Sequence, residues 1–158
     1  MQAYLVQHGE AKAEAEDPAR PLTDRGREEV RRVARHAAPA GVRVSEIRHS
    51  GKLRARQTAE ILAEYFKPPR GLSAMDGLAP DDDPGPARAA LEKTAEAVML
   101  VGHLPHLSRL ASSLVLGEAG REIVRFRNGA IVRLAKTDRG WLLEWILPPE
   151  LAGGPSSA

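Results

Sequence analysis

Short apolar runs alternate with amphipathic segments along most of the chain, and this alternation predicts an α/β fold. The first apolar run is Tyr4-Leu5-Val6, which leads directly into Gln7-His8-Gly9. A second run, Val98-Met99-Leu100-Val101, leads into Gly102-His103. Uninterrupted apolar runs of this length are typical of strands that are buried on both faces of a parallel sheet. We therefore predict two parallel strands, each with a histidine at its carboxyl end.

Helical periodicity indicates four helices, and alternating apolar positions indicate four further strands. In chain order we expect a helix capped by Thr23, a strand at 42–48, a helix at 52–66, a strand at 72–75, a helix at 87–95, the histidine-tipped strand at 97–101, a helix at 105–116, and strands at 129–135 and 141–147. The sequence thus predicts a mostly parallel sheet with an antiparallel C-terminal hairpin. We expect one domain at 1–150 and a frayed tail at 151–158. Trp141 and Trp145 are expected on one face of the last strand.

The bulk composition narrows the classes of function. A chain of 158 residues suits a single globular domain. Lys and Arg exceed Asp and Glu by only 23 to 21, and aromatic residues make up 4% of the chain, so we expect no nucleic-acid partner. No apolar segment is long enough for a transmembrane helix, and we expect no membrane partner and a cytoplasmic location. The lack of cysteine excludes thiolate catalysis and thiolate metal sites.

Side chains suited to phosphate chemistry are expected at one edge of the sheet. His8 and His103 follow two apolar strands, Ser50 follows the strand at 42–48, and Arg54 lies in the first turn of the next helix. Ligands bind at the carboxyl ends of the strands in open α/β sheets. An arginine gives bidentate hydrogen bonds to phosphate, one neutral imidazole can attack phosphorus, and a second can donate to the transferring oxygens. This chemistry requires no metal and no cofactor, and we expect neither.

Four short motifs follow one another along the chain. They are Leu5-Val6-Gln7-His8-Gly9-Glu10, Arg20-Pro21-Leu22-Thr23-Asp24-Arg25-Gly26, Ser50-Gly51-Lys52-Leu53-Arg54-Ala55-Arg56-Gln57-Thr58 and Val101-Gly102-His103-Leu104-Pro105. In this order and spacing they resemble the histidine phosphatase superfamily, and within it the short SixA-type phosphohistidine phosphatases. The resemblance is collinear over nearly the whole chain. It implies a three-layer α/β/α sandwich and a phosphatase activity that needs no metal.

The resemblance also implies roles for individual residues. His8 is expected to be the nucleophile that becomes transiently phosphorylated, while Arg54 and His103 bind the phosphoryl group and stabilise the transition state. Gln7 is expected to join them in binding phosphate. The implied partner is a phosphorylated histidine-containing protein. Further candidates for the pocket are Gly9, Glu10, Ser50 and Asp76.

Gln7 departs from the superfamily, whose opening motif is Arg-His-Gly. Glutamine can still donate hydrogen bonds to phosphate, but the loss of a charge-assisted bond costs about 1–3 kcal/mol of transition-state binding. A weakened phospho-binding module is therefore one alternative. A second alternative is a phosphatase for small phosphate esters, which needs a carboxylate such as Asp76 to protonate the leaving group.

Two other positions have open interpretations. Gly26 lies in the first turn of the helix capped by Thr23, where glycine costs stability relative to alanine. It either admits a neighbouring backbone or is simply tolerated. His106 follows His103 by three residues, and we expect it at the rim of the site or on the helix surface.

Overall fold

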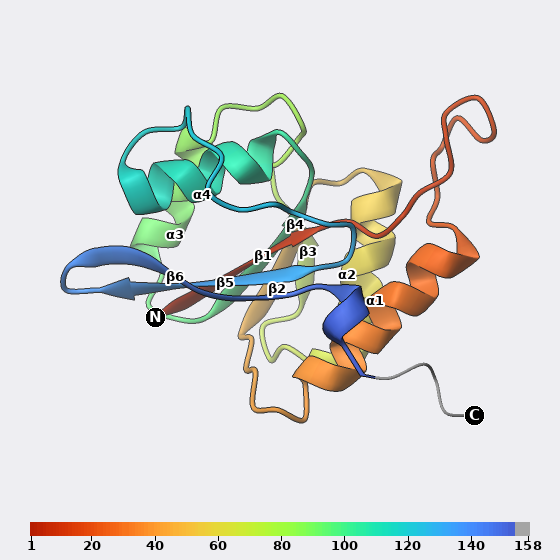
Figure 1. Ribbon diagram of the computed structural model, residues 1–158, viewed down its shortest axis with the longest axis horizontal. Helices are drawn as coiled ribbons and strands as arrows, with labels where there is room; N and C mark the ends of the chain where they lie inside the picture. The colour runs from red at the N-terminus through yellow and green to blue at the C-terminus, as the bar shows by residue number, and fades with distance from the viewer. Residues whose placement is uncertain (154–158) are drawn as a thin grey trace.

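A six-stranded sheet with the order β3-β2-β4-β1-β5-β6 forms the centre of the structure, a computed structural model that describes residues 1–153 (Figure 1). The strands are β1 (Gln2–Gln7), β2 (Glu46–His49), β3 (Leu72–Ala74), β4 (Val98–Gly102), β5 (Ile131–Thr137) and β6 (Gly140–Leu147). The first four strands are mutually parallel, whereas β5 is antiparallel to both β1 and β6. The predicted parallel sheet with an antiparallel C-terminal hairpin is confirmed.

Two helices cover each face of the sheet, so the predicted three-layer sandwich is also confirmed (Figure 1). The helices are α1 (Asp24–Ala37), α2 (Leu53–Phe66), α3 (Gly85–Lys93) and α4 (His106–Leu116). Tyr4 and Val6 of β1 pack on the side of α1 and α2, while Ala3 and Leu5 pack on the side of α3 and α4. Burial on both faces explains why this strand is apolar at successive positions. No helix in the described range has the length and apolarity needed to cross a membrane.

Helix α1 begins where the chain passes very close to the segment that follows β1. Thr23 is the N-cap, and its Oγ1 accepts a hydrogen bond from Gly26 N at 2.9 Å. Thr23 N also donates to Glu10 O at 2.9 Å. A Cβ atom on Gly26 would overlap the carbonyl oxygen of Glu10, so the glycine admits a neighbouring backbone. This approach fixes α1 against the segment that follows β1.

Several predicted boundaries differ from the structure. The helix expected at 87–95 is Gly85–Lys93, and the strand expected at 129–135 is Ile131–Thr137. The strand expected at 42–48 is shorter, because only Glu46–His49 pair with β3 and β4, while Val42 and Val44 pack on the core without joining the sheet. The predicted frayed tail also begins too early. A short 3₁₀ helix, η1 (Pro149–Leu151), is followed by Ala152, which is fully buried in the cluster under α1. Residues 154–158 of that predicted tail lie outside the described residues.

The prediction that both tryptophans share one face of the last strand is wrong. Trp141 packs with the α3 and α4 cluster, whereas Trp145 packs against the α1 and α2 cluster, where its ring lies 6.2 Å from that of Tyr4. Leu134 pairs with Leu143 and Arg133 with Trp145, so Glu144 is an extra residue in β6. A β-bulge of this kind shifts the alternation of side chains by one position.

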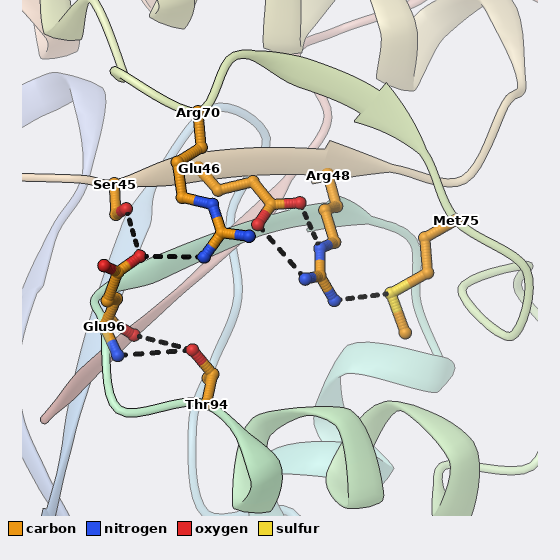
Figure 2. A network of polar contacts seen from close by, with 7 residues as sticks. All are labelled: Ser45, Glu46, Arg48, Arg70, Met75, Thr94 and Glu96. Carbon is orange, nitrogen blue, oxygen red and sulfur yellow. Dashed lines mark hydrogen bonds and ion pairs between the residues drawn. The ribbon is translucent and has the colours of Figure 1, made fainter.

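The sheet edge at β2 and β3 is held by polar contacts (Figure 2). Arg48 makes a bidentate pair with Glu46, through Nε to Oε1 at 2.7 Å and Nη2 to Oε2 at 3.1 Å. Glu96 accepts hydrogen bonds from Ser45 and Arg70. The hydrogen bond to Arg48 is the main reason that the pKa of Glu46 is lowered. The arginines of this cluster therefore already have carboxylate partners within the fold.

Candidate active site

The carboxyl ends of three neighbouring strands carry the predicted site residues. His8 follows β1, Ser50 follows β2 and His103 follows β4, and these strands are adjacent in the order β2-β4-β1. Gln7 pairs with Gly102, and His8 N donates to Gly102 O at 3.1 Å. The imidazole rings of His8 and His103 lie 5.1 Å apart between centroids and are tilted by 54°. The two parallel strands thus bring both imidazoles together at the carboxyl edge of the sheet.

The hydrogen bond of His8 defines which of its nitrogens is available. His8 Nδ1 lies 2.7 Å from Gly9 O. A carbonyl oxygen only accepts hydrogen bonds, so Nδ1 carries the proton and the lone pair of the neutral ring is on Nε2. Gly9 is itself held in place, because its N–H donates to Thr58 Oγ1 of α2 at 2.9 Å. The ring therefore presents an unprotonated Nε2 from a fixed backbone.

Burial keeps both imidazoles neutral. The pKa of His8 is lowered to about 4, mainly by desolvation; the hydrogen bond to Gly9 opposes this shift, and the charges of Arg54 and Arg20 add smaller lowering effects. Desolvation likewise lowers the pKa of His103 to about 3, with added effects from His8 and Arg54. At neutral pH the site therefore holds two uncharged imidazoles close to the positive charges of Arg54 and Arg20.

Ser50 and Lys52 form the wall beside His103. Ser50 Oγ lies 2.6 Å from His103 Nε2, and Lys52 N donates to Ser50 Oγ at 3.3 Å. His103 Nδ1 is buried and has no hydrogen-bond partner among residues 1–153. Ser50 thus fixes the ring through Nε2. Of the candidates for the pocket, Ser50 is the one that directly contacts a site histidine through its side chain.

Two arginines contribute positive charge to the site. Arg54 lies in the first turn of α2, where its Nε is buried without a hydrogen-bond partner in the described part of the chain. Its pKa is lowered by burial and by Arg20. Arg20 stands in a left-handed conformation with φ of 50°, and its Nε donates to Lys12 O at 3.0 Å. This bond leaves the terminal nitrogens of Arg20 available to an anion.

Three residues that contact or influence His8 and Gly9 are not marked as site residues by the sequence pattern. They are Arg20, Thr58 and Asn128. Asn128 Nδ2 donates to His8 O at 3.0 Å. Arg20 and Thr58 lie within motifs that the sequence displays, so the signal for them was present. Asn128 lies in the irregular segment before β5, and nothing in the sequence pattern marks it.

Three other residues considered from the sequence, Glu10, Asp76 and His106, do not contact the two site histidines through any hydrogen bond found within residues 1–153. Glu10 accepts a hydrogen bond from Thr23 Oγ1 at 2.7 Å and so stabilises the start of α1. Asp76 is exposed in the turn after β3 and is not among the charges that shift the pKa of His8 or His103. The expectation for His106 is wrong, because this residue is fully buried at the start of α4 rather than at the surface.

The arrangement is suited to binding a tetrahedral anion next to a nucleophile. Guanidinium groups bind phosphate oxygens, and a desolvated crevice strengthens each of these interactions. Gln7 extends this surface without charge, and its Oε1 is buried with no hydrogen-bond partner within residues 1–153. No group of three His, Asp or Glu side chains in that range is placed to hold a metal ion.

Comparisons with known proteins agree with this description. A sequence model of the histidine phosphatase superfamily (branch 1) matches residues 3–79. The phosphohistidine phosphatase SixA of Escherichia coli (strain K12) is 31% identical over 123 residues, which cover 75% of this chain and 76% of that protein. An uncharacterised protein of Picosynechococcus is 36% identical over 94% of this chain and its own full length. A structure of the protein histidine phosphatase SixA complexed with tungstate superposes with a TM-score of 0.81 at 28% identity, covering 94% of this chain and 97% of the other.

Proposed function

Because this chain belongs to the histidine phosphatase superfamily, we propose that it removes phosphate from protein phosphohistidine through a transient phosphohistidine on His8. The observation that carries the proposal is the 2.7 Å hydrogen bond from His8 Nδ1 to Gly9 O, which leaves Nε2 as the free nucleophilic atom. The likeness to SixA supports the choice of substrate.

In the first step, Nε2 of His8 attacks phosphorus in line with the bond to the substrate imidazole. That bond breaks, and its electron pair leaves with an imidazole that already carries a proton on its other nitrogen. Arg54, Arg20 and Gln7 hold the equatorial oxygens, and His103 donates a hydrogen bond to one of them. The negative charge of a bound phosphate dianion raises the pKa of His103 and so favours the donating form.

In the second step, water attacks phosphorus and releases phosphate. The bond from phosphorus to Nε2 breaks, and His8 returns to the neutral ring that keeps its Nδ1 proton. Because Gly9 O accepts a hydrogen bond from the Nδ1–H group throughout, His8 leaves as a neutral imidazole. The carbonyl of Gly9 thereby prepares His8 for both its attack and its departure.

The nature of the leaving group favours phosphohistidine over a phosphate ester. An alcohol needs a general acid, whereas a protonated imidazole leaves readily without one. Asp82 Oδ2 accepts a hydrogen bond from Ala79 N at 3.0 Å and Asp83 Oδ1 accepts one from Gly85 N at 2.7 Å, so these carboxylates stabilise their own loop. Asp76 remains the candidate acid for an ester substrate, and loss of ester hydrolysis in Asp76→Asn would support that alternative.

The direct test is rapid-quench labelling with phosphoramidate and with a histidine-phosphorylated protein. We expect acid-labile, base-stable phosphate on the wild-type chain and none on His8→Ala. The matched control is His36→Gln, which removes an exposed histidine and should keep the label.

Gln7 favours one rival, a phospho-binding module without turnover. That rival predicts that phosphate binds and that Arg54→Ala weakens the binding, while no label forms on His8. Such a result would replace the enzymatic proposal.

A further inference from the structure

A groove of about 290 Å³ is lined by residues that directly follow His103 in the chain and by residues that precede Asn128. One wall is formed by Leu104, Pro105 and Ser108, and the other by Val124 and Phe126. The two residues of the second wall are nearly buried, whereas the side chain of Leu104 is 39% exposed. A single exposed leucine is common on protein surfaces. Leu104 is of interest because it lines this groove and directly follows His103 in the chain.

Both walls are connected to the histidines of the site. Leu104 directly follows His103, and Leu107 N donates to His103 O at 2.9 Å, so the first turn of α4 is joined to that residue. The second wall continues into Asn128, whose amide donates to His8 O at 3.0 Å. Gly129 N also donates to Gln7 O at 2.9 Å. The two segments that line the groove are therefore joined directly to both histidines of the candidate site.

The composition of the groove indicates what it can bind. Leucine, proline, valine and phenylalanine provide an apolar interior, while Ser108, Glu122 and Arg125 provide polar groups at the rim. An aliphatic or aromatic side chain fits such an interior, and the rim can pair with the backbone on either side of it. A free phosphohistidine has no group that could occupy the groove while its phosphate lies at His8.

We propose that this groove, formed by Leu104–Ser108 and Glu122–Phe126, binds an apolar side chain of the phosphorylated protein, next to the phosphohistidine. The inference rests on the proposed function, because the continuity between groove and site has this meaning only if phosphate is carried on a protein. The groove adds specificity for the protein substrate. The arginines and histidines bind the phosphoryl group, and the groove binds a neighbouring side chain of the same protein.

The test uses synthetic peptides that carry a non-hydrolysable phosphohistidine analogue, phosphoryltriazolylalanine, in a glycine-serine background. A single leucine is placed in turn at each of the four positions on either side of the analogue, and the all-serine peptide is the reference. Fluorescence polarisation with the full chain gives each Kd. We expect at least one leucine position to tighten binding about tenfold, which corresponds to about 1.4 kcal/mol.

The preference should depend on the groove alone. Leu104→Asp and Ser108→Trp, which respectively charge and fill the groove, should remove the preference and leave the affinity of the serine peptide within about twofold. Leu142→Asp, which alters an exposed leucine of β6, should retain the preference. Equal affinities for all peptides in the wild type, or a preference that persists in both groove variants, would overturn the inference.

Failure of the groove and failure of the proposed function are distinguishable. Labelling of His8 by phosphoramidate does not need the groove, so a labelled enzyme that binds all peptides equally rejects the groove alone. A chain that neither accepts label on His8 nor binds any peptide rejects both.

Discussion

Ser50 Oγ and His103 Nε2 lie 2.6 Å apart, so this nitrogen of His103 is engaged by a serine. The two residues come from the ends of different strands, β2 and β4, and the hydrogen bond joins them. A bound phosphoryl group would compete for the same nitrogen. Ser50 therefore sets the orientation from which His103 acts.

Replacing Ser50 tests this relationship. Ser50→Ala removes the contact to Nε2, and we expect kcat/KM for phosphoramidate to fall about three- to tenfold because the ring of His103 loses its orientation. Ser73→Ala, which removes an exposed hydroxyl on β3, serves as the matched control and should have no effect. Unchanged turnover in Ser50→Ala would show that burial alone orients His103.

Arg20 is expected to compensate in part for the uncharged side chain of Gln7. Arg20 acts on both His8 and Arg54, so it provides part of the positive charge that the glutamine does not. We expect Arg20→Ala to lower kcat/KM about 10- to 100-fold and Gln7→Arg to raise it.

The double variant separates the two contributions. If Arg20 compensates for Gln7, the loss caused by Arg20→Ala should be smaller in the Gln7→Arg background, which a double-mutant cycle measures as a coupling energy. Additive effects would mean that the two positions act independently. Lower turnover in Gln7→Arg would show that glutamine is no handicap.

The buried histidines predict a loss of stability in mild acid. The folded-state pKa values of His8 and His103 are about 4 and about 3, below the ordinary value of 6.5. Between pH 6.5 and about 4 the unfolded chain binds protons that the folded chain does not, so the free energy of unfolding falls as the pH falls.

Urea denaturation at pH 7 and pH 5 measures this effect. His103→Gln should lose less stability between the two pH values than the wild type does, because one histidine no longer distinguishes the folded from the unfolded state. Equal losses in both proteins would contradict the assigned direction of the pKa shift.

Gly26 provides a test of the packing that supports the site. Because an added Cβ would overlap Glu10 O, we expect Gly26→Ala to lower the free energy of unfolding by about 2 kcal/mol or more. Gly120→Ala is the matched control, since no atom would lie within 4 Å of its Cβ, and it should change stability by less than about 0.5 kcal/mol. Equal effects would show that the segment after β1 moves easily.

Much of the site was predictable from local pattern. The apolar runs that end at His8 and His103 indicate strands buried on both faces, and parallel strands place their carboxyl ends at one edge. Thr23 also caps α1 as its position suggests. These features depend on residues close together in the sequence.

Contacts between distant segments were not predictable in the same way. The hydrogen bonds that Asn128 donates to His8, over 120 positions, and that Gly9 donates to Thr58, over 49, exist only after the sheet and helices have assembled. His106 is likewise buried, and Gly77 and Asp82 of the loop after β3 lie close enough to affect its pKa, a relation that helical periodicity does not encode.

The sequence by itself determined which residues end the strands and hence which side chains meet at one edge. The tertiary structure alone decided the tautomer of His8, the contact of Ser50 with His103, and the nearness of Arg20. The reason is physical: strand and helix patterns arise from local backbone geometry and the burial of alternate side chains. Proton positions and charge proximity instead depend on atoms that only the folded chain brings within a few ångströms.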